Sequence, residues 1–247
     1  MSNKENRRKA RMERAAELRR QEEKRQRNRK IAIVGAVAAV LVIVIGIGWL
    51  VQSQRDSTGE SAAAPEGATD EYGLVVGPDD ADSTVVVYED FLCPACAAFE
   101  QVTVAEFERM TDEGTLQVEY RPFELLDQTD YSKRATNAFA VVLDEHGPEV
   151  AKDFHDLLFA NQPQEAGSPP DDDWLVEQAE EAGADAEQVR GPIEDMAFEG
   201  WVENATDHAS QDGVRATPTV RVDGEDVEGQ SMQELIDNTM AAINGGG

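Results

Sequence analysis

The longest apolar run in the chain covers residues 31–51, IAIVGAVAAVLVIVIGIGWLV, and contains no charged residue. A helix of that length rises about 31 Å, which matches the hydrocarbon core of a bilayer. The segment that follows, 52–71, is small, polar and poor in large apolar side chains. The pattern predicts one transmembrane helix at 31–51 and a flexible linker at 52–71.

Beyond the linker, the spacing of apolar residues is typical first of a β-strand and then of an α-helix. The run TVVVYEDF at 84–91 is almost continuously β-branched or aromatic, which suits a central strand covered on both faces. The segment after it carries one helical stripe of apolar side chains, formed by Cys96, Phe99, Phe107 and Met110. We therefore expect a buried strand that leads directly into a helix.

Further strands are expected at 115–123 and at 216–222, the latter turning at Asp223-Gly224, which is a hairpin signal. Helix-compatible sequence fills most of the interval between them, about 124–212, and the chain closes with the helix SMQELIDNTMAAIN. Expected breaks in the helical interval are Gly147-Pro148, 163–170, Gly183 and Gly191-Pro192. Strands alternating with helices indicate an α/β fold with a helical insertion.

Charge is distributed unevenly along the chain. The total of 22 basic and 50 acidic residues gives a net charge of −28, yet residues 1–30 hold 13 Lys and Arg against 5 Glu. By the positive-inside rule, residues 1–30 form a cytoplasmic tail and the acidic domain at 72–247 lies outside. The tail is too long for a cleaved signal peptide, so we expect an uncleaved signal anchor in the cell membrane. The acidic balance argues against a nucleic-acid partner.

The two cysteines of the chain form one motif, Cys93-Pro94-Ala95-Cys96, between the predicted strand and helix. The unpaired N–H groups and the dipole at a helix N-terminus favour a thiolate at Cys93. Pro94 suits the first helical turn, where its missing N–H is not needed. Cys96 lies one turn inward, is more shielded, and is suited to resolve a mixed disulfide. The motif therefore predicts redox chemistry.

Two other interpretations of the motif remain open. Half of a zinc site would require two further ligands, but there is no second cysteine pair, and His146, His155 and His208 lack zinc-ligand spacing. A structural disulfide is the other alternative, although a helix start is an unusual place for one. We expect no cofactor and no metal. Glu89 and Asp90, just before the motif, either relay a proton to or from Cys96 or are solvated carboxylates at a strand end.

Taken together, YEDFLCPACAAFE, the helical insertion, the ATPTV segment, the hairpin and the terminal helix resemble the DsbA-like thiol:disulfide oxidoreductases of the thioredoxin superfamily. The resemblance covers about 72–247 and implies a thioredoxin-like fold with a helical insertion, preceded here by one transmembrane helix. It implies that Cys93 is the attacking cysteine and Cys96 its resolving partner. It also implies that Pro218 forms a cis bond facing the motif, with Thr217 before it. The prototype's histidine between the cysteines is replaced by Ala95.

The function implied is an extracytoplasmic enzyme that introduces disulfides into exported proteins. Its expected partners are unfolded exported substrates with free cysteines, a membrane redox partner that reoxidises the cysteine pair, and the lipid bilayer around 31–51. The alternatives are a reductase or isomerase of the same fold, or a chaperone-like module that binds exported proteins and in which the motif is incidental.

Overall fold

The computed structural model describes residues 62–70, 72–164 and 168–245. The predicted cytoplasmic tail at 1–30, the predicted membrane helix at 31–51 and the first part of the predicted linker lie outside these residues. Within the described ranges, no helix combines the length and the apolar character that a membrane crossing requires.

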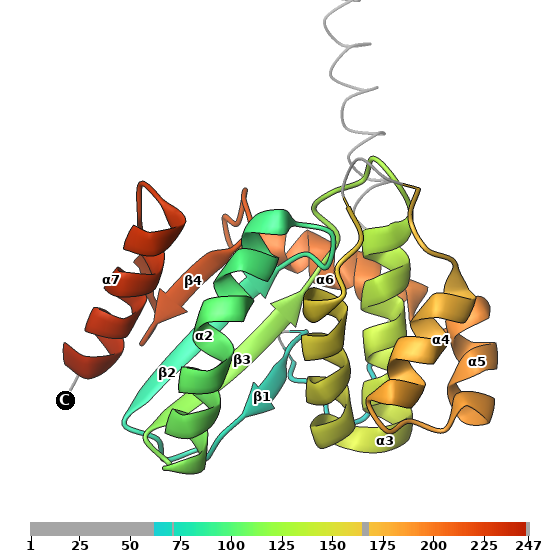
Figure 1. The fold of residues 1–247 in the computed structure, drawn as a ribbon, viewed down its shortest axis with the longest axis horizontal. Helices are drawn as coiled ribbons and strands as arrows, with labels where there is room; N and C mark the ends of the chain where they lie inside the picture. The colour runs from blue at the N-terminus through green and yellow to red at the C-terminus, as the bar shows by residue number, and fades with distance from the viewer. Residues whose placement is uncertain (1–61, 71, 165–167, 246–247) are drawn as a thin grey trace, which may run out of the picture. The chain divides into compact units, whose positions relative to one another are not determined.

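A mixed five-stranded sheet organises the described residues (Figure 1). Its strands, in chain order, are β1 Leu74–Val76, β2 Ser83–Glu89, β3 Leu116–Pro122, β4 Thr219–Val222 and β5 Glu225–Val227. The spatial order is β1-β3-β2-β4-β5, in which β2 and β3 are parallel and the other neighbours are antiparallel. The prediction that the 84–91 run forms a central strand is confirmed, as is the hairpin at Asp223-Gly224.

Both faces of β2 are covered, which explains its nearly continuous apolar sequence. Val85 and Val87 pack with Phe99 and Phe107 of helix α2 (Pro94–Asp112) and with side chains of helix α7 (Met232–Gly245). Tyr88, which points to the opposite face, packs with residues of helix α6 (Glu199–Gln211). The predicted helical stripe of α2 is buried as expected, because it faces this sheet.

The helical insertion consists of α3 (Tyr131–Ala160), α4 (Asp172–Glu181), α5 (Ala186–Glu194) and α6. Figure 1 shows α3, α4 and α5 beside the sheet, whereas α6 packs on the face of the sheet to which Tyr88 points. The predicted break at Gly147 is a kink within α3, where Gly147 has φ 82°. The predicted break at Gly191-Pro192 is wrong, because α5 continues through it to Glu194. Val189 and Ile193 on either side of that pair are buried and hold the helix in place.

The second half of the predicted flexible linker, residues 62–70, is packed on the domain. Pro65 is buried, and the Glu66 backbone N–H donates to Asp144 at 2.7 Å. The Thr69 hydroxyl donates to Glu119 at 2.6 Å. The prediction of a flexible linker is wrong for residues 62–70, because Ala and Pro, although typical of linkers, are apolar enough to pack against a core. The short strand β1, which follows this segment, was also not predicted.

Candidate active site

The cysteine motif lies where β2 ends and α2 begins. Cys93 is the residue before the first helical turn, with an extended backbone at φ −76° and ψ 114°, and Pro94 is the first residue of the helix. The Cys93 carbonyl accepts hydrogen bonds from the N–H groups of Cys96 at 3.0 Å and Ala97 at 3.2 Å. Cys93 is 8% exposed and Cys96 is 0% exposed, and both are free thiols. A solute can therefore approach only the first sulfur.

The two thiols have opposite acid strengths. The pKa of Cys93 is lowered to about 6, chiefly because the Cys96 thiol donates to its sulfur, with help from backbone N–H groups of the helix start. Partial burial of Cys93 opposes this shift. Burial raises the pKa of Cys96 well above its usual value, and the nearby charges of Cys93 and Glu89 add to the effect. One sulfur is thus held ready to ionise while its partner keeps its proton.

Thr217 and Pro218 are distant from the cysteine motif in the sequence but lie beside it in the structure. The Thr217–Pro218 peptide bond is cis, as the family resemblance implies. The Cys93 thiol donates to the Thr217 carbonyl oxygen at 3.4 Å. The structure therefore brings together all four residues that the sequence singled out, Cys93, Cys96, Thr217 and Pro218.

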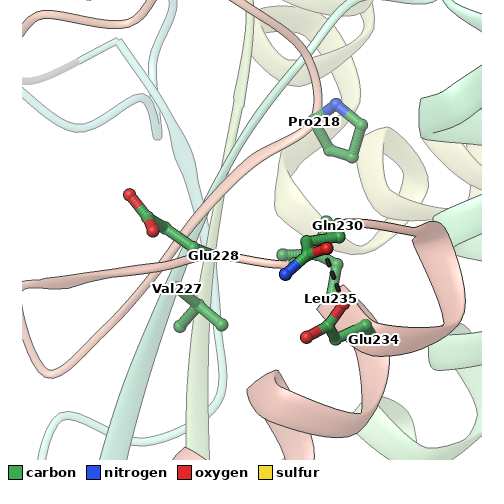
Figure 2. Close-up of a pocket in the computed structure, with 7 residues that line it drawn as sticks. Pro218, Val227, Glu228, Gln230, Glu234 and Leu235 are labelled. Carbon is green, nitrogen blue, oxygen red and sulfur yellow. Dashed lines mark hydrogen bonds between the residues drawn. The ribbon is translucent and has the colours of Figure 1, made fainter.

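A groove of about 520 Å³ begins at Pro218. Figure 2 shows Pro218 facing the segment between β5 and α7. The groove is lined by Glu228, Gly229 and Gln230 of that segment, by Val227 at the end of β5, and by Glu234 and Leu235 of α7. The segment is held against the helix, because the Gln230 N–H donates to the Glu234 carboxylate at 2.9 Å. The groove offers an extended chain both apolar side chains and carboxylates, and it starts at the residue that follows Thr217.

Gln162, just after α3, fixes the backbone of the motif. Its side-chain amide donates to the carbonyl oxygens of Phe91 and Cys93, at 3.0 Å in each case. The helical insertion therefore stabilises the loop from Asp90 to Cys93, which is called the redox loop below. Sequence reasoning missed Gln162, and nothing in its surrounding sequence distinguishes it from an ordinary polar residue after a helix.

Asp90 is a structural anchor of the loop before the motif. It is fully buried, and its carboxylate accepts from the N–H groups of Leu92, Leu125 and Leu126 at 2.8 Å each and from the Ser132 hydroxyl at 2.7 Å. Burial raises its pKa, although these hydrogen bonds oppose the rise. The prediction of solvated carboxylates at this strand end is wrong, because both Glu89 and Asp90 are 0% exposed.

Glu89 belongs to a buried network beneath the cysteines. Its carboxylate contacts His155 Nε2, and His155 Nδ1 lies 2.9 Å from Asp156. Asp156 also pairs with Lys152 at 2.6 Å. Burial opposes the charge on His155, but the two carboxylates outweigh it and raise the histidine pKa to about 10. The network therefore alternates negative and positive groups.

Glu100, on the inner face of α2, completes this buried group. It is 4% exposed, and burial together with the charge of Glu89 raises its pKa to about 8. Potential metal-ligand atoms of Glu100, His155 and Asp156 lie within 4.8 Å of one another. Both histidine nitrogens are already engaged by carboxylates, so we interpret the group as an ionic network. Sequence reasoning singled out Glu89 of this group but missed Glu100, although its four-residue spacing from Cys96 places the two residues on the same face of the helix.

Comparison with known proteins agrees with this geometry. A family model described as Thioredoxin matches residues 69–241. The solved structure of oxidised Mtb DsbA is 31% identical, with 69% of this chain and 92% of that one covered and a TM-score of 0.58. A probable disulfide bond formation protein D from Bacillus cereus is 23% identical, with 87% of this chain and 99% of that protein covered.

One curated relative is much longer than this chain. A Na(+)/H(+) antiporter, NhaA 3 from Salinispora tropica, is 33% identical over 150 residues, which are 61% of this chain but 21% of the antiporter. The chain thus spans about a fifth of that relative, and the match concerns one part of it. The family model, the DsbA match and the cysteine geometry together establish that the chain belongs to the thioredoxin family, among its DsbA-like members.

Proposed function

We propose that this chain is an extracytoplasmic thiol:disulfide oxidoreductase that introduces disulfides into exported proteins. The observation that carries the proposal is the asymmetry of the cysteine pair. Cys93 is the more exposed sulfur and has a pKa of about 6, whereas Cys96 is fully buried and has a raised pKa. A stabilised thiolate at Cys93 favours the reduced pair, which makes the corresponding disulfide an oxidant.

In the proposed cycle, a client thiolate attacks Cys93 Sγ of the Cys93–Cys96 disulfide. A mixed disulfide forms, and Cys96 leaves as a thiolate that takes up a proton. A second client thiolate then attacks the client sulfur of the mixed disulfide, which creates the client disulfide and releases the Cys93 thiolate. Two electrons pass from the client to the cysteine pair. The low pKa of Cys93 makes it a good leaving group in this last step.

The client chain is proposed to lie along the groove that starts at Pro218. Thr217 places its carbonyl oxygen 3.4 Å from the Cys93 sulfur, so a chain that reaches this sulfur passes the Thr217 backbone. The groove continues from there along Val227 to Leu235. Catalytic roles are thus proposed for Cys93 and Cys96, and positioning of the client for Thr217 and Pro218.

The remaining parts of the proposal concern location and regeneration. The basic tail and the apolar run at 31–51 support a single-pass anchor in the cell membrane with the redox domain outside. Outside the cytoplasm, disulfides between cysteine pairs persist, whereas the cytoplasm keeps thiols reduced. A membrane redox partner is proposed to reoxidise Cys93 and Cys96 after each cycle.

The test uses the purified full chain and a reduced, unfolded protein that contains cysteines. We expect the chain to form disulfides in that protein, Cys93→Ser to abolish the activity, and Cys96→Ser to accumulate mixed disulfides. Full activity in both variants would contradict the proposal and favour a binding module. Equilibration with glutathione buffers then separates an oxidase, with a reduction potential of about −120 mV, from a reductase, with a reduction potential of about −270 mV.

A further inference from the structure

A group of side chains that can ligate a metal ion joins helix α2 to helix α3. Glu100 supplies a carboxylate from α2, and His155 and Asp156 supply an imidazole and a second carboxylate from α3. One potential ligand atom of each residue lies within 4.8 Å of those of the other two. Glu100 is 4% exposed and His155 is 0% exposed, so two of the three ligands are held in the interior. Because two helices supply the group, ligand spacing along the sequence does not reveal it.

Unpartnered carboxyl oxygens indicate that a ligand binds at this place. Among the described residues, neither carboxyl oxygen of Glu100 has a hydrogen-bond partner, and the second carboxyl oxygen of Glu89 also has none. Buried carboxyl groups normally have such partners, because their removal from water is costly. A cation bound beside Glu100 would supply the missing partner for its carboxylate.

The histidine of the group is oriented as metal-binding histidines usually are. Its Nε2 atom contacts the Glu89 carboxylate, and its Nδ1 atom lies 2.9 Å from Asp156. A histidine that binds a metal through one ring nitrogen generally donates from the other nitrogen to a carboxylate, which fixes the orientation of the ring. Glu89 occupies this outer position at Nε2. The nitrogen that faces the ion is therefore Nδ1, on the side of Asp156.

The charge of the group matches a divalent cation. Three carboxylates lie around the imidazole, those of Glu89, Glu100 and Asp156. Lys152 pairs with Asp156 at 2.6 Å and supplies one positive charge. With the carboxylates ionised and the imidazole neutral, the group carries two uncompensated negative charges, which are costly in the protein interior. One divalent cation cancels them.

The surface end of the group gives an ion a route of entry. The Asp156 side chain is 26% exposed and lines a depression of about 380 Å³. Asp153 and Glu181 line the same depression, so its rim attracts cations. An ion that enters there meets Asp156 first, and the buried His155 and Glu100 lie behind it.

We propose that Glu100, His155 and Asp156 bind a divalent metal ion, for which Zn²⁺ is the best match. An imidazole nitrogen suits zinc, whereas calcium and magnesium prefer oxygen ligands alone. The ion replaces the hydrogen between His155 Nδ1 and Asp156, and that proton passes to solvent. Three protein ligands leave one position of a tetrahedral zinc ion for water. The ionic network of Glu89, His155 and Asp156 is the metal-free form of this site, and the bound ion ties α2 to α3.

The experiment uses the purified full chain without a histidine tag. The chain is stripped of metal with a chelator and kept with Cys93 and Cys96 joined as a disulfide, because free thiols also bind zinc. Titration calorimetry with Zn²⁺ is expected to show one site per chain. The melting temperature should rise by about 5–10 °C at a zinc concentration about 100-fold above the dissociation constant. An equal rise with Ca²⁺ would assign the effect to the acidic surface and overturn the proposal.

The buried ligand is tested by substitutions that keep the shape of the side chain. Glu89→Gln is expected to weaken zinc binding by about 10- to 100-fold, the usual cost of losing an outer carboxylate on a ligating histidine. Glu100→Gln removes a ligand itself and should weaken binding by more than about 100-fold. Glu108→Gln, an exposed change on the same helix, is the matched control and should bind zinc like the unmodified chain.

A second pair of variants tests the surface end and decides the question if Glu100→Gln does not fold. Asp156→Asn is expected to weaken zinc binding by at least about tenfold. Asp153→Asn removes a carboxylate from the same depression without removing a ligand, and should leave the affinity unchanged. Thermal melts without zinc establish that each variant is folded.

The proposed site is overturned if the unmodified chain binds no zinc, or if Glu100→Gln and Asp156→Asn bind it as tightly as the unmodified chain. Losses in Glu108→Gln and Asp153→Asn as large as those in the ligand variants would place the ion on the acidic surface and would also overturn the site. None of these results bears on the proposed disulfide chemistry, which is measured by transfer to a reduced protein.

Discussion

The Cys93 thiol lies 3.4 Å from the backbone carbonyl oxygen of Thr217, although 124 residues separate the two in the chain. The pairing of β2 with β4, which sets Val87 opposite Val220 and Tyr88 opposite Thr219, produces this approach. The strand that leads into the cysteines and the strand that follows Pro218 are therefore neighbours in one sheet. An incoming chain meets the reactive sulfur and the Thr217 backbone at the same place.

The first prediction concerns the acid strength of Cys93. Because the Cys96 thiol is the main donor to the Cys93 sulfur, Cys96→Ala should raise the Cys93 pKa from about 6 toward its ordinary value. Cys96→Ser keeps a donor and should leave the pKa close to that of the unmodified chain. Ultraviolet absorbance of the thiolate during a pH titration measures both. Equal midpoints in the two variants would contradict this explanation.

The second prediction concerns the brace from the helical insertion. Gln162→Ala removes two hydrogen bonds to the carbonyl oxygens of Phe91 and Cys93, so the free energy of unfolding should fall by about 1–3 kcal/mol. The looser redox loop should also slow disulfide transfer. Chemical denaturation and the transfer assay measure these effects. Gln128→Ala, at an exposed position, is the control and should change neither quantity.

The third prediction concerns the buried anchor Asp90. In the unmodified chain, the Leu125 and Leu126 backbone N–H groups both donate to one carboxylate oxygen of Asp90. Asp90→Asn replaces one carboxylate oxygen with an amide NH2 group, which cannot accept a hydrogen bond from a backbone N–H group. We expect the free energy of unfolding to fall by about 2–4 kcal/mol, as for a buried charge-assisted network that is broken. Denaturant titration provides the measurement. Asp127→Asn, an exposed carboxylate nearby, should cost little, and a similar loss in both variants would rule out a special role for Asp90.

The fourth prediction is a pH dependence of stability. The pKa of Glu100 is raised from 4.5 to about 8, so the folded state holds a proton that the unfolded state has released. The contribution of this proton to the free energy of unfolding is fully present below about pH 4.5 and is lost as the pH rises through about 8. The free energy of unfolding changes by at most about 1.4 kcal/mol per pH unit from this group.

Glu100→Gln should remove this component, and unfolding free energies measured from pH 5 to pH 9 test it. The curve of the variant should be flatter than that of the unmodified chain over this interval. Parallel curves would show that Glu100 has an ordinary pKa in the folded state.

The fifth prediction concerns client preference. The groove beside Pro218 is lined by Glu228 and Glu234, and the Glu228 carboxylate has no hydrogen bond or ion pair among the described residues. Seven of the eight Lys and Arg side chains at 62–245 already pair with carboxylates. A peptide with Lys close to its cysteine should therefore be oxidised faster than the matching peptide with Glu.

Rapid mixing with the two peptides measures the preference. Glu228→Gln should reduce it by about two- to fivefold, the range of an exposed ion pair, and added salt should have a similar effect. Glu225→Gln makes the same charge change outside the groove and should alter the preference little. An equal effect of the two substitutions would assign the preference to the overall charge of the domain.

Local patterns in the sequence were enough to predict the framework that carries the cysteines. The β-branched run ending near Phe91 predicted a strand covered on both faces, and the apolar stripe from Cys96 to Met110 predicted a helix with one buried face. The turn at Asp223-Gly224 followed from the backbone freedom of its residues. The roles of Thr217 and Pro218 came from family resemblance, since no local rule distinguishes a cis bond from a trans one.

The tertiary structure alone decided the polar interior of the site. Glu89 and His155 are 66 residues apart, and Gln162 reaches the Cys93 carbonyl across 69 residues. The periodic pattern of apolar residues in a sequence does not show whether a charged or amide side chain is buried. Whether such a side chain finds a hydrogen-bond partner depends on which distant elements pack against it. The sequence therefore determined where the sulfur chemistry lies, while the packing of α3 against α2 and β2 determined which polar groups lie around the sulfurs.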